Sequence, residues 1–416
     1  MNSKIKNRSF LCIDLKSFFA TAECVERGLD PFSYPLVVAN PKQGNGAITL
    51  AVSPFLKNQG VKSRSRLYEI PKHIKYVVVP AKMSLYERQS EAVKDVYLEF
   101  VSCEDLHVYS IDEAWLDVSD YLSLYKKSDY ELALEILDRI NKKTGLYASC
   151  GIGPNMFLAK VAMDVEAKKY KDGIAKWGYD DIQNSLWSIT PLSKIWGIGA
   201  KMEQKLNALG IYCVGDLAKY NKIRLEQKFG IIGSELHNHA NGIDNSQIKD
   251  WKEAPKDKSY SHSQVLFKDY YAHNIKLIIE EMADVITARL RREKKTTKSL
   301  GFSIGYSKTS TGGFRHMVKL DIATSSPATI SDVCFNIFDK FYDGSPIRLV
   351  GISVGKLEDK NAIQLDLFKE YEEKEAEDVV NMTVDAIKSK FGKNSLIKAS
   401  SLLDDSTAME RNRNKN

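Results

Sequence analysis

The chain has 416 residues, a formal net charge of +6 and a hydrophobic content of 43%. This length exceeds what one compact core supports, so we expect two to four domains. No apolar run reaches the roughly 18 residues of a membrane span. The first residues, M-N-S-K-I-K-N-R, lack the apolar stretch of a signal peptide. The small positive charge does not by itself indicate nucleic-acid binding.

Cysteine usage favours a reducing compartment. The six cysteines are scattered and form no C-x-x-C pair (Cys12, Cys24, Cys103, Cys150, Cys213 and Cys334). Several lie in apolar runs, so we expect reduced core residues in a cytoplasmic protein and no zinc site.

A carboxylate follows the first apolar segment. Residues Phe10–Ile13 form a continuous apolar run, which is typical of a strand buried on both faces, and Asp14 comes directly after it. A carboxylate at the end of a core strand requires a partner or a cation. Alternatively, Asp14 caps a helix that begins near Lys16.

The next segments predict a small α/β region. We expect a short helix over 20–28, a strand over 36–39, a hairpin loop over 40–46, a strand over 46–53 and a helix over 54–60. Four cations cluster in its second half (Lys57, Lys62, Arg64 and Arg66). They form either a solvated basic surface or a set of phosphate contacts.

Two adjacent acids lie between two short predicted strands in the segment His107–Val118, H-V-Y-S-I-D-E-A-W-L-D-V. A tight turn can direct Asp112 and Glu113 to one place, although a surface turn with two solvated acids is the alternative. Hard oxygen ligands suit Mg²⁺. With Asp14, these residues would form a three-carboxylate site able to hold two metal ions, the arrangement used for in-line displacement at phosphorus.

The hairpin lies among palm-like elements. We predict amphipathic helices over 84–101 and 130–144 and a strand over 147–152, which together describe an antiparallel sheet with helices on one face. A further helix follows Pro154, and Lys160 and Lys168 share a face of it.

Residues Leu192–Gly210 predict a helix-hairpin-helix, with the turn G-I-G at Gly197–Gly199. Its glycines would let backbone N–H groups at the next helix hold a DNA phosphate, with Lys201 adding charge. An ordinary corner between helices is the alternative. The segment Phe229–Gly233 resembles a degenerate second hairpin. His237 and His239 are two apart on a helix and so do not form a metal site.

The last third predicts a separate domain. Residues 247–260 are charged and aperiodic, as in a linker. We then expect a strand over 261–267, a helix over 273–294, strands over 299–306 and 313–320, a helix over 328–342 and a strand over 347–356. This is a β-α-β-β-α-β unit. Basic residues on it could contact duplex phosphates without reading sequence (Arg291, Arg292, Lys298, Arg315 and Lys319).

The segments D-L-K-S-F-F-A and Y-S-I-D-E-A-W-L-D-V resemble the two catalytic motifs of the Y-family, translesion DNA polymerases. The wider pattern, from about residue 8 to 405, is most similar to the UmuC-type branch with the UV-damage repair proteins of Gram-positive bacteria. The resemblance implies an α+β, multidomain right hand. Its parts would be a palm (1–18 and 80–175), small fingers (19–79), a thumb with the helix-hairpin-helix (176–245), a linker (246–260), a little finger (261–357) and a C-terminal tail (358–416).

The resemblance also implies roles for residues of the site. Asp14, Asp112 and Glu113 would be catalytic and, with the carbonyl of Leu15, would bind two Mg²⁺ ions. Phe18 and Phe19 would lie at the nucleotide site, Phe19 as the steric gate against a ribose 2′-hydroxyl and Phe18 as a core ring. Ser53, Lys57 and Lys168 would contact the triphosphate. Lys160 is the fallback for Lys168, and a solvated helix face remains the alternative for both.

A short peptide resembles a docking motif. Residues 364–368, Q-L-D-L-F, match the peptide by which bacterial polymerases bind the β sliding clamp, with Gln364, Leu365, Leu367 and Phe368 as contacts. One helix is expected beyond it, over 376–391, followed by a disordered end.

The resulting hypothesis is an error-prone, SOS-type lesion-bypass DNA polymerase that uses primer-template DNA and dNTPs, and is cytoplasmic and monomeric. The first alternative is a non-catalytic DNA-repair adaptor that binds DNA and the clamp. The second is a nucleotide cyclase, another palm enzyme with paired acids, in which the helix-hairpin-helix, the clamp peptide and the basic domain would have no role.

Overall fold

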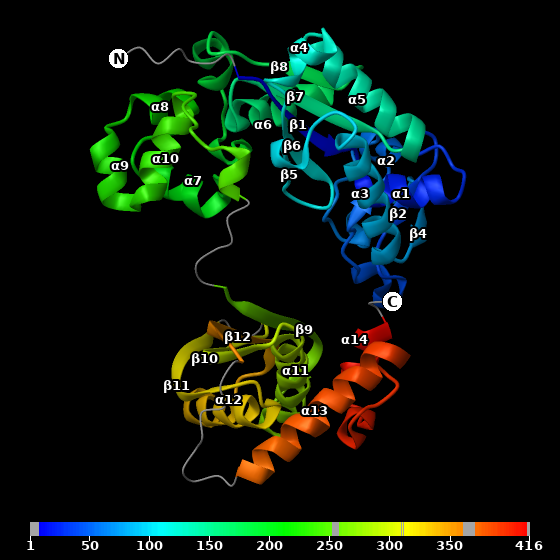
Figure 1. Ribbon diagram of the computed structural model, residues 1–416, viewed down its shortest axis with the longest axis vertical. Helices are drawn as coiled ribbons and strands as arrows, with labels where there is room; N and C mark the ends of the chain where they lie inside the picture. Colours follow the sequence, from blue (N-terminus) through cyan, green and yellow to red (C-terminus); the bar gives the residue numbers. More distant parts are fainter. Residues whose placement is uncertain (1–7, 252–257, 309, 311, 361–370, 414–416) are drawn as a thin grey trace. The chain divides into compact units, whose positions relative to one another are not determined.

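The computed structural model describes residues 8–251, 258–308, 310, 312–360 and 371–413. The chain divides into two compact units, residues 1–253 and 254–416, each with its own layers of secondary structure (Figure 1). The division falls within the predicted linker. The predicted clamp peptide, 364–368, lies outside the described residues. None of the described helices has the length and apolar character of a membrane span.

The first unit is built on a five-stranded sheet in the order β5-β6-β1-β7-β8. Its central strand is β1 (Phe10–Leu15), which pairs antiparallel with both β6 (Glu113–Asp117) and β7 (Ala148–Gly153). β5 (Leu106–Val108) is antiparallel to β6, and β8 (Ile174–Lys176) is parallel to β7. The predicted strands of the palm are therefore confirmed, and the edge strand β8 is an addition.

Helices cover both faces of this sheet, so the prediction of helices on one face was wrong. α3 (Met83–Tyr97) and α5 (Asp129–Thr144) pack on one face, and α6 (Met156–Val165) packs on the other. Glycine in β7 permits this second layer, because a Cβ on Gly151 would lie 2.0 Å from the carbonyl oxygen of Ala159 in α6.

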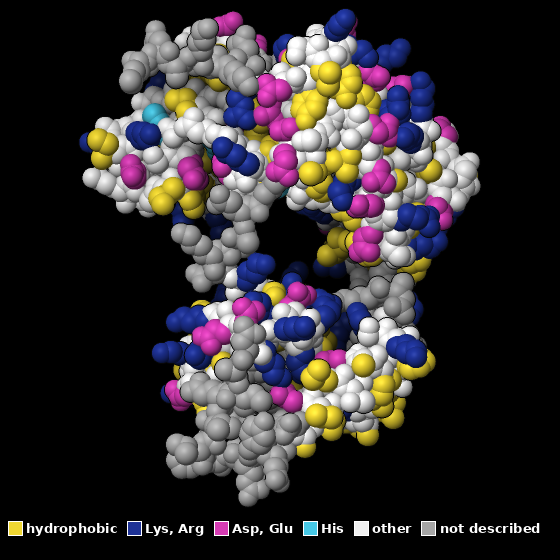
Figure 2. Space-filling view, viewed as in Figure 1, with side chains coloured by type: hydrophobic (Ala, Val, Ile, Leu, Met, Phe, Trp, Pro, Cys, Tyr) yellow, Lys and Arg dark blue, Asp and Glu magenta, His cyan; other side chains and the backbone are white. Residues whose placement is uncertain are grey.

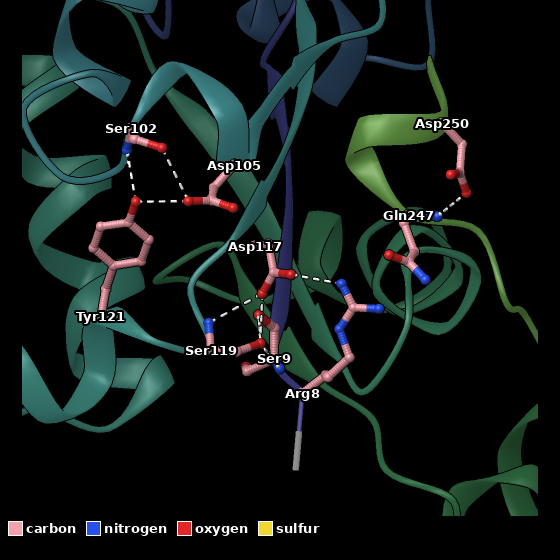
Figure 3. A network of polar contacts seen from close by, with 9 residues as sticks. All are labelled: Arg8, Ser9, Ser102, Asp105, Asp117, Ser119, Tyr121, Gln247 and Asp250. Atoms are coloured by element: carbon pink, nitrogen blue, oxygen red, sulfur yellow. Dashed lines mark hydrogen bonds and ion pairs between the residues drawn. The ribbon is translucent and has the colours of Figure 1, made fainter. Parts of the chain in front are cut away.

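The far end of the sheet is held by a polar network. Figure 3 shows Arg8 and Ser119 around Asp117 of β6, with an Arg8–Asp117 ion pair of 2.7 Å. Ser9 beside them donates a hydrogen bond of 2.9 Å to Asp129 at the start of α5. Asp117 is thus a structural carboxylate, unlike the acids at the other end of the same strand.

A three-stranded sheet in the order β3-β2-β4 forms the predicted α/β region. β2 (Leu36–Val38) pairs antiparallel with β3 (Ala51–Val52) and parallel with β4 (Val77–Val79), a strand that the sequence analysis missed. α2 (Pro54–Asn58) follows β3. α1 (Phe18–Glu26) starts at the end of the palm strand, and its buried residues pack on this small sheet.

In the helical region that follows, the second predicted hairpin, and not the first, has a helix on each side. Before the first G-I-G turn there is only a 3₁₀ turn, Leu192–Lys194, and after it comes α7 (Ala200–Asn207). α8 (Val214–Lys219) leads to a hairpin flanked by two helices, α9 (Lys222–Phe229) and α10 (Ile231–Ala240). The segment called degenerate is therefore the more complete helix-hairpin-helix. Gly233 allows its helices to touch, because a Cβ there would lie 2.2 Å from the carbonyl oxygen of Leu225.

The described start of the predicted linker is packed rather than extended. Ile248–Trp251 form a 3₁₀ turn in which Ile248 is 3% exposed, and Trp251 stacks on His107 with ring centroids 5.1 Å apart. His107 in turn stacks on the buried Trp115.

The second unit confirms the predicted β-α-β-β-α-β order. Its sheet has the order β11-β10-β12-β9, all antiparallel, and is formed by β9 (Tyr260–Tyr270), β10 (Lys295–Tyr306), β11 (Gly313–Thr324) and β12 (Ile347–Asp359). α11 (Ala272–Arg292) and α12 (Pro327–Phe341) share a core with one face of this sheet.

The C-terminal segment belongs to this unit. α13 (Tyr371–Phe391) and α14 (Ala408–Arg413) follow each other with a short 3₁₀ turn between them, Ala399–Leu402. The Glu281 carboxylate of α11, only 5% exposed, accepts hydrogen bonds from Ser406 and Thr407. The expectation of a disordered end was therefore wrong for residues 405–413. Exposed apolar side chains gather over this segment in Figure 2, among them Val379, Val380 and Met382.

Candidate active site

Strand register brings the predicted acids together. Asp14 at the end of β1 lies directly opposite Glu113 at the start of β6 and, on its other side, opposite Ser149 of β7. Residues that are directly paired across antiparallel strands point to the same face of the sheet. Glu113, Asp14 and Ser149 therefore form one row, next to the end of α6.

Asp14 is a carboxylate with little solvent. Its side chain is 22% exposed, and the nearest cation, Lys168 Nζ, is 3.6 Å away. Burial raises the pKa of Asp14 to about 6; Lys168 opposes this rise, while the negative charges of Asp112 and Glu113 add to it. The alternative that Asp14 caps a helix was wrong, because Ser17 holds the N-cap position of α1.

The turn between β5 and β6 holds Asp112 beside β1. The backbone N–H of Leu15 donates to the carbonyl oxygen of Asp112 at 2.9 Å, which joins the turn to the end of β1. The Ser110 hydroxyl donates to the Asp112 carboxylate at 2.7 Å. The turn itself is closed by the N–H groups of Tyr109 and Ser110, which both donate to the carbonyl oxygen of Glu113.

Glu113 is compensated by a buried lysine. Lys160 of α6, with 8% of its side chain exposed, lies 2.9 Å from Glu113 and 3.0 Å from Asp164. Burial alone would lower the pKa of Lys160, but the charges of its neighbours, including Glu113 and Asp164, raise it above its ordinary value. The buried Cys12 thiol, whose pKa is raised by burial and by Glu113, donates to Glu113 at 3.4 Å.

Asp164 connects the two lysines that the sequence analysis considered. It lies 3.0 Å from Lys160 and 2.9 Å from Lys168. Lys168 is in a 3₁₀ turn after α6, Ala167–Lys169, and also approaches Asp14. The result is a chain of alternating charge: Glu113, Lys160, Asp164, Lys168, Asp14. It places a lysine next to each of the two acids Asp14 and Glu113.

The nucleotide-site predictions have mixed outcomes. Lys57 is exposed, and its charge interacts with those of Asp14, Asp112 and Lys168, so the structure brings it to the acids. Phe18 is a core residue, 3% exposed, as its expected role as a core ring requires. Phe19 is half-buried and stacks on Tyr86 with ring centroids 4.2 Å apart.

Two predicted contacts are wrong. Ser53 is fully buried and caps α2: its hydroxyl donates to the carbonyl oxygen of Tyr34 at 2.8 Å and accepts from Leu36 N at 3.2 Å, so it does not face a triphosphate. Arg291 is not a free DNA contact, because its side chain is 7% exposed and forms a two-pronged ion pair with Asp385 of α13.

The other predicted DNA contacts remain at the surface. Arg292 pairs with Glu293, and Lys298 pairs with Glu358, but 73% and 32% of these two basic side chains are exposed. Arg315 is exposed on β11. In the first unit, Gly197 has φ +88°, which only glycine adopts readily, and Gly199 occupies the N-cap position of α7 without a side-chain cap. Lys201 is exposed beside it.

Sequence reasoning missed four residues of the site: Cys12, Ser110, Ser149 and Asp164. One of them had a visible signal, because Lys160, Asp164 and Lys168 are spaced four residues apart and fall on one helical face. The others are recognised only through pairing across strands or within a turn, which a single sequence does not reveal.

The carboxylate oxygens of the candidate site are donor atoms of the kind that a divalent cation binds. Among the described residues, no three His, Cys, Asp or Glu side chains are arranged as a metal cluster. The acids are instead occupied by Lys160, Lys168 and Ser110. However, strand pairing and the Leu15–Asp112 hydrogen bond bring Asp14, Asp112 and Glu113 to one place, and Lys168 Nζ approaches Asp14 only to 3.6 Å. Hard carboxylate oxygens are the ligands that Mg²⁺ prefers.

Comparison with known proteins agrees with this geometry. Residues 13–164 match the impB/mucB/samB family, residues 179–211 match its helix-hairpin-helix motif, and residues 257–367 match its C-terminal domain. A Bacillus subtilis protein described as UV-damage repair protein UvrX is 38% identical over 98% of this chain and 97% of its own length. DNA polymerase IV 2 of the same organism is 31% identical over 98% of both chains.

The chain therefore belongs to the impB/mucB/samB family, the Y family of DNA-directed DNA polymerases. The α+β architecture with a catalytic domain, a helix-hairpin-helix region and a C-terminal domain of little-finger type is that of the family. Membership excludes the nucleotide cyclase, and its relatives are named for DNA synthesis and UV-damage repair.

The chain of alternating charge predicts that the two lysines contribute differently to the free energy of unfolding. Lys160→Met removes the buried cation between two acids, so we expect a loss of about 3 kcal/mol in unfolding free energy. Lys168→Met, the matched control, removes a lysine that is 43% exposed and should cost about 1 kcal/mol or less. Urea unfolding without divalent metal measures both, followed by tryptophan fluorescence, because all five tryptophans lie in the first unit. Equal losses for the two variants would contradict the prediction.

Proposed function

We propose that this protein extends a DNA primer against a damaged template by nucleotidyl transfer to the primer 3′-hydroxyl, as an error-prone lesion-bypass polymerase of an SOS-type response. The observation that carries the proposal is the row of desolvated carboxylates at the ends of β1 and β6, with Lys57 and Lys168 facing it. Carboxylates that can bind cations, next to lysines that can turn to a phosphate, suit phosphoryl chemistry.

The metal ligands would be Asp14, Asp112, Glu113 and the carbonyl oxygen of Leu15. Two bound Mg²⁺ ions would lower the pKa of the attacking hydroxyl and neutralise charge on the triphosphate and the leaving pyrophosphate. The chain's own residues prepare this site. Lys160 holds Glu113 in place, and the Leu15–Asp112 hydrogen bond keeps Asp112 beside Asp14.

Lys168 and Lys57 would bind the triphosphate. Lys168 is shared between Asp14 and Asp164 and is 43% exposed, so it can turn to a phosphate at modest cost once Asp14 acquires another cation. Phe19 would exclude a ribose 2′-hydroxyl. Its stacking partner Tyr86 donates a hydrogen bond of 3.0 Å to the fully buried Glu23, which fixes the ring on which Phe19 rests.

The second unit would bind the DNA backbone through its open sheet face. On the face away from α11 and α12, cross-strand rows consist of small residues, such as Ser303–Gly351–Ser263 and Gly301–Ser353–Ser261. The first row ends at the exposed Arg315 of β11. The small side chains of these two rows let phosphates approach the sheet between the larger Met317 and Leu349 on the same face, while cations attract the phosphates without reading bases. Lys and Arg side chains are spread over this unit (Figure 2).

In the first unit, the Gly197–Gly199 turn with Lys201 would contact a further phosphate through backbone N–H groups. Residues 364–368 would dock on the β sliding clamp and so keep a weakly bound polymerase near the primer. We place the protein in the cytoplasm as a monomer. The alternative, a DNA-repair adaptor without catalysis, requires the acids to be dispensable.

Primer extension tests the acids. With Mg²⁺ and four dNTPs, we expect Asp112→Ala to lower the rate roughly 10²–10³-fold, the scale of losing one electrostatic contact to developing charge. Asp117→Ala is the control, because Asp117 ends β6, the strand that follows Asp112, and pairs with Arg8 instead. Anisotropy of labelled primer-template should show equal DNA binding for both. DNA binding without extension by the wild type would favour the adaptor.

Sugar selection tests Phe19. Phe19→Ala should raise the ratio of ribonucleotide to deoxyribonucleotide incorporation by about tenfold or more, because a steric contact with the 2′-hydroxyl is lost. Single-nucleotide kinetics with each nucleotide type measure this ratio. Phe18→Leu is the control: it alters a buried ring and should reduce stability without changing the ratio. An unchanged ratio in Phe19→Ala would remove Phe19 from the site.

Clamp dependence tests the pentapeptide. Replacing Leu367 and Phe368 with alanine should leave extension without the clamp intact and abolish the increase in product length when the β clamp is loaded. Replacing Leu402 and Leu403, an exposed pair in the C-terminal segment, is the matched control and should keep the increase. Loss of stimulation in both double variants would assign clamp binding to the wider segment.

A further inference from the structure

Ser149 carries a buried hydroxyl without a partner. The residue lies in β7, next to the central strand β1, is 0% exposed, and none of the described residues forms a hydrogen bond with its Oγ. A buried donor that is left unsatisfied lowers stability, and such groups in native proteins call for an explanation. Alanine would fit the same place on the strand without that cost.

The position of Ser149 suggests the explanation. Ser149 is directly opposite Asp14 in the β1–β7 register, so both side chains project from the same face of the sheet. On the other side of Asp14, Glu113 is already engaged by Lys160 and by the Cys12 thiol. Asp14 is therefore the acceptor next to Ser149 that is least satisfied.

Within the described part of the chain, Lys168 is the one cation that forms an ion pair with Asp14. Lys168 Nζ lies 3.6 Å away, beyond ordinary hydrogen-bond distance, and no described residue donates a hydrogen bond to the Asp14 carboxylate. Cross-strand Cβ atoms are about 5 Å apart, so rotation of the Ser149 side chain about χ1 brings its hydroxyl within reach of that carboxylate. Two under-satisfied groups thus face each other across one strand pair.

We propose that Ser149 is a positioning residue, whose hydroxyl donates to Asp14 when Lys168 leaves to bind the triphosphate. This inference rests on the proposed polymerase function. The departure of Lys168 would leave the Asp14 carboxylate free to rotate, and a donor from β7 fixes its orientation for ligand binding. The hydroxyl is partnerless in the unloaded protein because its role belongs to the loaded state.

Ser149→Ala separates this role from a structural one. We expect the variant to unfold at the same or a higher urea concentration than the wild type in metal-free buffer, because a buried unsatisfied group is removed. Its kcat for single-nucleotide addition should fall about tenfold or more, the effect of losing a hydrogen bond to a charged group. Ser149→Thr keeps the hydroxyl and should recover most of that rate.

Ser9→Ala is the matched control. Ser9 precedes the other end of β1, and its buried hydroxyl donates to Asp129, so this variant should unfold at lower urea and keep its kcat. A lower unfolding midpoint for Ser149→Ala, or an unchanged kcat, would overturn the proposal.

A second readout does not depend on catalysis. Mg²⁺ alone should raise the midpoint of tryptophan-detected unfolding in the wild type, because a ligand that binds the folded state stabilises it. We expect a smaller rise for Ser149→Ala and an undiminished rise for Ser9→Ala. Equal rises would overturn the role of Ser149. Failure of the wild type to extend primers would instead remove the proposed function, and the Mg²⁺ comparison would still decide whether Ser149 positions Asp14.

Discussion

The structure of the first unit depends on holding negative charge away from water at the ends of two paired strands. Asp14 and Glu113 are adjacent because of the β1–β6 register. Asp112 lies beside them because its carbonyl oxygen accepts a hydrogen bond from the backbone N–H of Leu15. Such an arrangement is stable only with nearby cations. Lys160 and Lys168 provide them from α6 and the turn after it, and Asp164 keeps both lysines in place. The second helical layer is thus required by electrostatics as well as by the apolar core.

Much of this was accessible from sequence because the signals were local. A four-residue apolar run ending in an acid, two acids between β-rich segments, and the alternation of strands and helices after residue 260 each predict structure within about 20 residues. The predicted β-α-β-β-α-β order of the second unit agrees with the observed order, whereas the C-terminal segment beyond it holds more structure than predicted. Asp14, Asp112 and Glu113 were predicted to form one site for the same reason: each lies at or beside the end of an element whose type is clear from its own composition.

The features that the sequence analysis missed or predicted wrongly depend on contacts between segments that are far apart in the sequence. The pairing of β7 with β1 is what places Ser149 opposite Asp14. The ion pair with Asp385, 94 residues further along the chain, is what makes Arg291 unavailable as a DNA contact. Ser53 was predicted as a triphosphate contact from the family resemblance, but it is buried and caps α2. The second layer on the palm sheet required Gly151 and Gly153 to face α6, a close approach that glycines in a strand permit but do not specify.

The two units differ in the groups that their candidate binding surfaces present. The first concentrates carboxylates at the ends of two paired strands and compensates them with Lys160 and Lys168. The second has two rows of glycine and serine on its open sheet face, and a Cβ at either glycine would be crowded: one on Gly301 would lie 2.4 Å from the Ser353 hydroxyl, and one on Gly351 would lie 2.6 Å from that of Ser303. Such a face offers backbone and hydroxyl groups but few side chains that could distinguish bases. Contact of this kind is indifferent to sequence and to base damage, which is what the proposed synthesis across lesions requires of the domain that holds the duplex.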